Sequence, residues 1–218
     1  MDHPTDGARA KGLWRQRLRP LRLEHGAQAQ AAILDHARRE LIGPLPPGRR
    51  LGLYWPLAGE IDLRSLAEPA AESPGAASPA RAGTPLWALP AVAGRAGQGR
   101  LEYRAWQPGE PLAPDACGIA APEGAALLPE ALGLLLVPAL AVDRQGIRLG
   151  YGGGWYDRLR SDPAWRSVPS LVVVPAGCVV DGLPCDPWDV PFDGWLDEGG
   201  VHWLAAAGTV PGAPAPPT

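Results

Sequence analysis

The sequence predicts one α/β domain of three layers, with a mostly parallel sheet and helices on both of its faces. Two observations favour this fold class. Short apolar segments that are typical of buried strands recur along the chain, and segments with a helical spacing of apolar residues lie between them. A length of 218 residues suits one such domain, which we expect to span residues 1–205.

Two helices are predicted at the start of the chain. Residues 8–19 have a helical composition, and Pro20 is expected to end this helix, because proline lacks an N–H group and clashes with the preceding turn. A second helix is expected over residues 26–41, with Gly43 beyond its end. Its inward side chains should be those at helical spacing, which are Ala31, Leu34, Ala37 and Leu41.

Strands are predicted at residues 50–56, 85–92, 100–106, 132–140 and 170–174. The segment 132–140 is the most apolar of them, and we expect it to be a central strand that is buried on both faces. A short helix should follow the first strand, with Asp62 as its cap. Another helix should begin at Trp155, directly after a glycine-rich segment.

Composition and charge limit the classes of partner. A net charge of −3 argues against a protein that coats nucleic acid, which needs a basic excess. No apolar run is long enough to cross a bilayer, and the first residues do not resemble a secretory signal. We expect a cytoplasmic monomer that acts on small molecules. A reducing compartment also fits the cysteines, which form no C-x-x-C pair: Cys117, Cys178 and Cys185.

Glycine and proline are abundant, with 28 and 27 residues, and many of them lie in two segments. Residues 72–84 are predicted to be a flexible insertion, and residues 206–218 a disordered tail. Basic residues gather near the start of the chain, where they form either a solvated helix face or an anion-binding surface. They are Arg9, Lys11, Arg15, Arg17, Arg19 and Arg22.

The glycine-rich segment G-I-R-L-G-Y-G-G-G-W-Y-D, residues 146–157, follows the most apolar strand and leads into a helix. Arg148 can add a forked contact to phosphate, and Asp157 is placed to hold Mg²⁺. Taken alone, the pattern also fits a structural turn, since it is neither a Walker loop nor a dinucleotide-binding fingerprint. The glycines that let main-chain N–H groups meet phosphate oxygens are Gly150, Gly152, Gly153 and Gly154.

The segment 135–159 resembles the signature of the 5-formyltetrahydrofolate cyclo-ligase family, also called the methenyltetrahydrofolate synthetases. The likeness extends over residues 8–196, and it implies a fold similar to those of ribose-5-phosphate isomerase and glucosamine-phosphate deaminase. The residues that stand at the family's spacing are Asp143, Gly146, Arg148, Leu149, Gly150, Gly152, Gly154, Tyr156 and Asp157.

Three further segments resemble the family in the same order. Lys11 and Arg15 form its K-x-x-x-R pair, which contacts the phosphates of ATP. Glu60 matches the glutamate that binds the folate, and Trp55 lies beside a position that packs on the substrate. Asp189 matches an aspartate that assists the metal. The nearby acidic alternatives are Asp186 and Asp193.

The resemblance implies an enzyme that converts 5-formyltetrahydrofolate and ATP to 5,10-methenyltetrahydrofolate, ADP and phosphate, with Mg²⁺ as cofactor. The implied catalytic residues are Arg148, Lys11 and Tyr156, the substrate-binding residues are Trp55 and Glu60, and the metal ligands are Asp157 and Asp189. The implied nucleotide-binding residues are Lys11, Arg15, Arg148, Leu149, Gly150, Tyr151, Gly152, Gly153, Gly154, Trp155 and Tyr156.

Some positions depart from the family's pattern. Trp188 stands where the family usually has histidine, and Cys178 stands where glutamine is common. Pro175 and Val142 each replace an aromatic residue. Two alternatives therefore stay open, namely a related ATP-dependent enzyme with a different small substrate and a non-catalytic binding protein that keeps the fold.

Overall fold

The computed structural model describes residues 6–68, 85–94 and 99–204 of the chain. The predicted insertion at residues 72–84 and the predicted tail at residues 206–218 lie outside these ranges. Among the described residues, no helix combines the length and the apolar character that crossing a bilayer would require.

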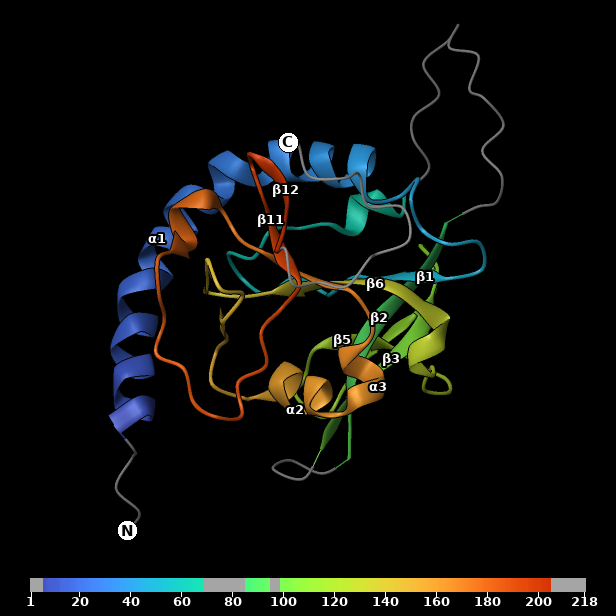
Figure 1. Ribbon diagram of the computed structural model, residues 1–218. Coiled ribbons are helices and arrows are strands. Elements are labelled where there is room, and N and C mark those ends of the chain that lie inside the picture. Colours follow the sequence, from blue (N-terminus) through green and yellow to red (C-terminus); the bar gives the residue numbers. More distant parts are fainter. Residues whose placement is uncertain (1–5, 69–84, 95–98, 205–218) are drawn as a thin grey trace, which may run out of the picture.

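A seven-stranded sheet forms the centre of the fold (Figure 1). Its members are β1 (Arg50–Gly52), β2 (Leu86–Ala93), β3 (Arg100–Trp106), β6 (Leu132–Pro138), β9 (Ser170–Val173), β11 (Gly194–Asp197) and β12 (Gly200–Trp203). They lie in the order β12-β11-β9-β6-β1-β2-β3. The strands from β11 to β2 are parallel, and the edge strands β12 and β3 pair antiparallel with their neighbours. The predicted mostly parallel sheet is therefore confirmed.

Strand β6 is the buried centre of this sheet, as the sequence predicts. It pairs in parallel with β1 on one side and with β9 on the other. Leu135 and Val137 pack in one core cluster and Leu136 packs in another. Successive side chains of a strand point to opposite faces, so β6 separates two layers of hydrophobic core.

One continuous helix, α1 (Asp6–Glu40), replaces the two helices that the sequence predicts. Pro20 lies inside it, so the prediction that Pro20 ends a helix is wrong. An interior proline removes a main-chain hydrogen bond and favours a bend, and Figure 1 shows α1 rising along one side of the molecule and then crossing its top. The helix continues because side chains on both sides of Pro20 are buried, including Leu18 and Ile33, and this tertiary packing overrides the local preference.

The C-terminal half of α1 covers one face of the sheet. The buried side chains on this face are spaced four residues apart: Ala29, Ile33 and Ala37 belong to α1, and Leu41 follows its last residue. They pack with Leu136 of β6. Ala31 was expected to face inward but is exposed, since the buried stripe follows Ala29 and Ile33 instead.

The other face of the sheet carries α2 (Trp155–Ser161) and α3 (Pro163–Arg166). Tyr156 and Leu159 of α2 pack with Val137 and Val172 of the sheet. A small sheet in the order β10-β7-β8 joins this layer, and its strands are β7 (Ala141–Asp143), β8 (Arg148–Leu149) and β10 (Val179–Val180). The α/β class is confirmed, while the specific likeness to ribose-5-phosphate isomerase and glucosamine-phosphate deaminase stays a prediction.

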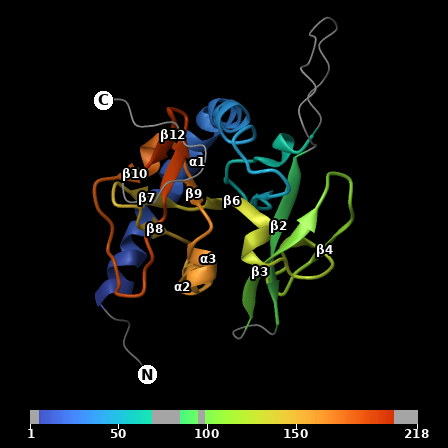
Figure 2. The same cartoon turned by 45° about the vertical axis from the view of Figure 1, so that its right-hand side comes forward.

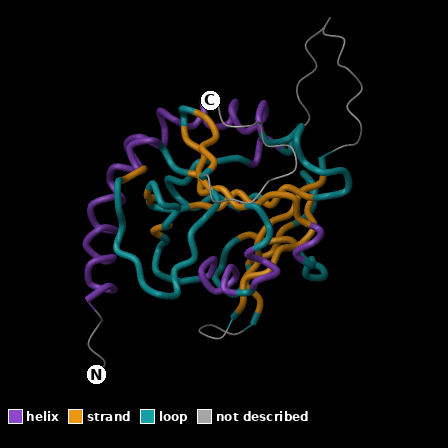
Figure 3. The backbone as a smooth tube through the Cα atoms, viewed as in Figure 1, coloured by secondary structure: helices purple, strands orange, loops and turns teal. Residues whose placement is uncertain are grey.

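The remaining elements are short and lie around the sheet. The helix expected after β1 is a single 3-10 turn, η1 (Arg64–Leu66), and its N-cap is Leu63 rather than the predicted Asp62. The Asp62 Oδ1 atom nevertheless accepts a hydrogen bond of 2.9 Å from the Arg64 amide. A loop at residues 181–193 joins β10 to β11 (Figure 3). Figure 2 shows β2 and β3 on the side of the molecule away from β11 and β12. The other short elements are β4 (Leu112–Pro114), β5 (Ala120–Pro122), η2 (Pro129–Ala131) and η3 (Ala176–Cys178).

Candidate active site

The turn between β7 and β8 builds the base of the glycine-rich segment. The Asp143 Oδ1 atom accepts hydrogen bonds of 2.9 Å from the amides of Gln145 and Ile147, and its Oδ2 atom accepts one of 3.0 Å from the Leu183 amide. Gly146 has a φ of +85°, and a Cβ atom there would lie 2.4 Å from the Phe192 carbonyl oxygen. Asp143 and Gly146 therefore shape the turn, and no side chain fits at Gly146.

The loop from Gly150 to Gly154 then carries the chain into α2. Gly152 has a φ of +110° and Gly154, which precedes the helix, has a φ of +64°. Both values lie in the left-handed region that favours glycine. Arg15 of α1 donates a hydrogen bond of 2.9 Å from Nε to the Gly150 carbonyl oxygen. The N-terminal half of α1 thus holds this loop from outside.

One cavity of about 200 Å³ brings together many of the predicted site residues. It lies beside Pro138, the last residue of β6 and hence at the carboxyl end of the parallel strands, where α/β folds commonly bind ligands. The predicted residues that line it are Trp55, Glu60, Arg148, Gly150, Tyr151, Gly153, Gly154, Trp155 and Tyr156.

Four of the predicted nucleotide-binding residues do not line this cavity, and neither do the predicted metal ligands Asp157 and Asp189. Leu149 is 1% exposed and belongs to the core. Gly152 lies where an added Cβ atom would come within 3.9 Å of the Arg15 guanidinium carbon. Lys11 and Arg15 come from α1: Arg15 contacts the Gly150 carbonyl oxygen from outside the cavity, and Lys11 contacts Asp189 in the loop at residues 181–193.

Arg148 is held at the wall of the cavity. Its Nε atom donates a hydrogen bond of 3.0 Å to the Pro138 carbonyl oxygen, and its guanidinium carbon lies 4.8 Å from the Tyr156 ring centroid. Burial raises the pKa of Tyr156 to about 12, although the Arg148 cation opposes this shift. Tyr156 therefore stays protonated at neutral pH and offers an aromatic face and an O–H group rather than a phenolate.

Glu60 is a buried carboxylate that lines the same cavity. Its Oε2 atom accepts a hydrogen bond of 2.7 Å from the Leu57 amide. Its Oε1 atom is buried and has no hydrogen-bond partner among the described residues. A buried acceptor without a partner is costly, so Oε1 suits an N–H or O–H donor of a bound ligand.

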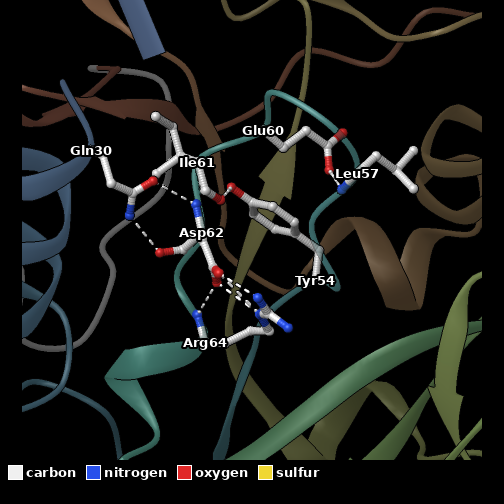
Figure 4. A network of polar contacts seen from close by, with 7 residues as sticks. All are labelled: Gln30, Tyr54, Leu57, Glu60, Ile61, Asp62 and Arg64. Carbon is white, nitrogen blue, oxygen red and sulfur yellow. Dashed lines mark hydrogen bonds and ion pairs between the residues drawn. The ribbon is translucent and has the colours of Figure 1, made fainter. Parts of the chain in front are cut away.

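The segment that carries Trp55 and Glu60 is fixed by a polar network (Figure 4). Tyr54 donates a hydrogen bond of 2.6 Å from its Oη atom to the Ile61 carbonyl oxygen. Gln30 of α1 exchanges two hydrogen bonds, of 2.7 and 2.8 Å, with the main chain of Asp62. The guanidinium of Arg64 lies 4.4 Å from the centroid of the Trp55 ring. These contacts give the predicted substrate-binding residues a defined backbone.

Lys11 is ion-paired in the loop at residues 181–193. Its Nζ atom lies 2.7 Å from Asp186 Oδ2 and 2.5 Å from Asp189 Oδ2. Burial opposes the charge of Lys11, but the two carboxylates outweigh it and raise its pKa. The predicted phosphate contact and one predicted metal ligand are therefore neighbours.

The predicted metal ligands are carboxylates, the ligand type that Mg²⁺ prefers. Asp157 lies in the first turn of α2 and has no hydrogen-bond or ion-pair partner in the described ranges. Asp189 forms an ion pair with Lys11. No group of three or more His, Cys, Asp or Glu side chains in the described part of the chain is arranged to hold a metal. One or two carboxylates suffice for an Mg²⁺ ion whose other ligands are phosphate oxygens and water.

Arg22 is the main residue that the sequence prediction missed. It is 6% exposed and contacts both the Glu60 segment and Tyr151. Its position, seven residues after Arg15 and eleven after Lys11, places it on the same helix face. The mistaken helix end at Pro20 hid this spacing. The sequence prediction also missed one wall of the cavity, which is formed by β2, β3 and the segment that follows β3. Its residues are Pro90, Val92, Leu101, Asp115, Cys117 and Ile119.

The positions that depart from the family pattern lie away from this cavity. Val142, Pro175 and Cys178 are buried. Trp188 is 64% exposed. None of the four lines the cavity beside the glycine-rich loop.

A second, larger groove lies at the amino end of strand β6. Its volume is about 760 Å³, and its wall includes Leu132, Leu134 and Trp203. None of the predicted site residues lines it. We therefore place the candidate site at the smaller cavity, where the predicted residues meet.

Comparison with known proteins finds similarity over the part of the chain that contains the glycine-rich loop. The sequence model of the 5-formyltetrahydrofolate cyclo-ligase family matches residues 84–197. The chain is similar to a 5-formyltetrahydrofolate cyclo-ligase of Mycolicibacterium smegmatis, with 38% identity over 93 residues, which are 41% of this chain and 47% of that protein. A 5-formyltetrahydrofolate cyclo-ligase of Haemophilus influenzae is 38% identical over 66 residues, 28% of this chain and 33% of that protein. The matches thus span half or less of these curated relatives.

Two solved structures resemble the whole fold. The 5,10-methenyltetrahydrofolate synthetase of Aquifex aeolicus has a TM-score of 0.66 and 25% identity, over 89% of this chain and 93% of that one. The 5,10-methenyltetrahydrofolate synthetase of Mycoplasma pneumoniae has a TM-score of 0.61, over 85% of this chain and 97% of that one, and its 18% identity bears on the fold alone. By its matched segment, which covers more than half of the chain, and by its fold, this chain belongs to the 5-formyltetrahydrofolate cyclo-ligase family.

Proposed function

We propose that this chain converts 5-formyltetrahydrofolate and ATP to 5,10-methenyltetrahydrofolate, ADP and phosphate. One observation carries the proposal. A single cavity joins Glu60 and Trp55, the residues assigned to the folate, with Arg148 and the glycine-rich loop, which are assigned to the nucleotide. The two substrates must meet in the reaction, so their proposed binding residues should share one space.

The formyl oxygen of the substrate is a poor leaving group until it is phosphorylated. The formyl oxygen attacks the γ-phosphorus of ATP, the bond from that phosphorus to the bridging oxygen breaks, and ADP leaves. The N10 atom of the folate then attacks the activated formyl carbon and loses its proton, while the carbon–oxygen bond breaks and releases phosphate. The formyl oxygen leaves in that phosphate, so atoms and charges balance. None of these steps requires a nucleophilic side chain.

Phosphoryl transfer asks the protein mainly for positioning and for charge neutralisation. Arg148 is our candidate for contact with the transferred group, because it lines the cavity and is fixed by the Pro138 carbonyl oxygen. Arg15 adds positive charge at the Gly150 carbonyl oxygen, and Lys11 adds it beside Asp189, the second proposed metal ligand. Tyr156 supplies a protonated phenol and an aromatic surface beside Arg148.

We assign magnesium to Asp157 and Asp189. When bound with the nucleotide, Mg²⁺ supplies neutralising charge to the phosphate oxygens. Asp157 supports this assignment because its carboxylate has no other partner in the described ranges. Asp189 supports it less directly, since its carboxylate is paired with Lys11. A cytoplasmic location and a monomeric state, which the sequence predicts, belong to the same proposal.

Product formation tests the proposal directly. The purified chain should form the ultraviolet-absorbing methenyl product from 5-formyltetrahydrofolate only when ATP and Mg²⁺ are both present. ATP hydrolysis without methenyl product would favour a related enzyme with a different small substrate. If neither ATP hydrolysis nor methenyl product appeared, the chain would be a binding protein that keeps the fold.

A further inference from the structure

Arg22 is a buried cation that connects three parts of the molecule. It belongs to α1, and its Nη2 atom donates a hydrogen bond of 3.0 Å to the Ala58 carbonyl oxygen. Its Nη1 atom donates one of 2.5 Å to the Tyr151 Oη atom in the glycine-rich loop. The same Nη1 atom lies 3.9 Å from Glu60 Oε1. One guanidinium therefore touches the segment assigned to the folate and the loop assigned to the nucleotide.

The arrangement is incomplete as a structural ion pair. Arg22 Nε and Glu60 Oε1 are both buried and have no hydrogen-bond partner among the described residues. A buried charge is tolerated when it is paired, and an unpaired buried polar atom is costly. Arg22 therefore offsets the charge of Glu60 while leaving Oε1 free to accept a hydrogen bond from a ligand.

Tyr151 is the third residue of the group that Arg22 and Glu60 form. Burial and then the nearby Glu60 carboxylate raise the pKa of Tyr151, whereas the Arg22 cation opposes the shift. The phenol stays protonated and accepts the hydrogen bond from Arg22 through its oxygen. Tyr151 and Glu60 both line the cavity, but Arg22 does not. Arg22 thus acts on the cavity only through the residues that it holds.

We propose that Arg22 is a positioning residue, which holds Glu60 and Tyr151 in the orientation that accepts the folate. The inference rests on the proposed function, because it takes Glu60 as the folate-binding carboxylate. It adds a residue outside the family motif and assigns it to the binding of one substrate. Loss of Arg22 should leave Glu60 as an uncompensated buried charge, free to turn away from the cavity.

Equilibrium binding of 5-formyltetrahydrofolate without ATP tests this role in four proteins. These are the wild type, Arg22→Met, Glu60→Gln and the double variant. We expect Arg22→Met to weaken folate binding by about tenfold in the wild-type background and by less than about twofold in the Glu60→Gln background, because residues that act through each other are not additive. Arg19→Met, a substitution at an exposed arginine of the same helix, should leave folate affinity unchanged.

The outcomes separate this inference from the proposed function. If the wild type binds no folate, the proposed function fails, and the role of Arg22 fails with it. If the wild type binds folate and Arg22→Met binds it equally well, only the Arg22 inference is overturned. Equal weakening in both backgrounds would also overturn it, since Arg22 would then not act through Glu60.

A second variant guards against a folding defect. Arg22→Lys keeps the charge but loses the fork that reaches two acceptors at once. If circular dichroism shows that Arg22→Met is unfolded, Arg22→Lys takes its place in the same cycle. We expect an intermediate loss of folate affinity that again disappears with Glu60→Gln. An undiminished affinity in folded Arg22→Lys would contradict the need for a guanidinium.

Discussion

The two ends of strand β6 differ in volume and in chemistry. At the amino end, Leu132 and Leu134 line a groove of about 760 Å³. At the carboxyl end, Pro138 borders a cavity of about 200 Å³ beside the glycine-rich loop. The smaller space is lined by Arg148 and the glycine-rich loop, which we assign to the nucleotide, and by Glu60, which we assign to the folate. We therefore place the proposed site by the direction of the parallel strands rather than by cavity size.

The cavity and the groove also differ in their buried polar atoms. The buried side-chain atoms that lack a partner in the described ranges include Glu60 Oε1 and Arg22 Nε, both at or beside the carboxyl-end cavity. None of these atoms belongs to a residue that lines the amino-end groove. Charged residues of the groove, such as Arg39 and Glu130, are exposed. We therefore expect substitutions at the carboxyl end to change catalysis, and those at the amino end to change only stability.

Arg148→Ala should give the largest effect. Removing a cation that faces the transferred phosphoryl group should lower kcat by roughly 10²–10³-fold. The fold should persist, because Arg148 is only partly buried at the cavity wall. Steady-state assays measure kcat, and circular dichroism measures whether the fold persists. Arg144→Ala is the matched control, since Arg144 is an exposed residue just before β8 whose ion pair is with Asp181. Full activity in Arg148→Ala would contradict the assignment.

Asp157→Asn should change the metal dependence. Losing one of two proposed carboxylate ligands should raise the Mg²⁺ concentration for half-maximal rate by about tenfold or more, in the range that loss of groups around a metal site commonly produces. A magnesium titration of the rate measures it. Asp181→Asn removes an exposed carboxylate as the control. Identical titrations for Asp157→Asn and the wild type would argue against this ligand.

The tyrosines should titrate abnormally at high pH. Burial raises the pKa of Tyr156 from 10.0 to about 12, and burial likewise raises the pKa values of Tyr54, Tyr103 and Tyr151. Each phenol holds its proton more tightly in the folded state. Its contribution to stability is therefore complete below the unfolded pKa and is lost as pH rises through the folded pKa.

Near-ultraviolet absorbance, followed together with circular dichroism, measures this titration. Phenolate should appear only at a pH above the normal tyrosine pKa and together with unfolding. Three of the four tyrosines line the carboxyl-end cavity, so the titration reports on that end: Tyr54, Tyr151 and Tyr156. The chain unfolded in guanidinium is the control and should titrate normally. Phenolate formation near the normal pKa in the folded protein would refute the burial of these side chains.

Trp203→Ala should give the smallest functional effect. Trp203 lines the amino-end groove and is partly buried against the core. Its truncation should lower the free energy of unfolding by about 1–2 kcal/mol, in proportion to the apolar area that it loses. Both KM values and kcat should stay within about twofold of the wild type, because surface changes far from a site rarely couple to it. Denaturant unfolding and steady-state kinetics check this. A large rise in either KM would mean that the groove takes part in substrate binding.

Much of the fold follows from local sequence patterns. The β6 segment and the two strands at residues 85–92 and 100–106 were predicted within a few residues, because apolar residues dominate the first two segments and alternate with charged residues in the third. The helix after the glycine-rich loop was also predicted. Pro20 was misjudged, because a local rule cannot include the tertiary packing of Leu18 and Ile33.

The site was predictable where its residues belong to one motif. Arg148 to Tyr156 are consecutive, and Glu60 and Trp55 could be added only through the resemblance to the family. The wall from β2 and β3 has no local signal, since Pro90 and Leu101 come together only when the sheet forms. Arg22 had a signal in its helical spacing from Lys11 and Arg15, which an uninterrupted α1 would have revealed.

The central claim is that the carboxyl-end cavity couples ATP cleavage to closure of the folate ring. The most direct measurement is the ratio of methenyl product to phosphate released by the wild-type protein with Mg²⁺ and both substrates. We predict equal amounts of the two products, and no phosphate release when 5-formyltetrahydrofolate is left out. Phosphate release that is independent of the folate, or without methenyl product, would contradict the claim.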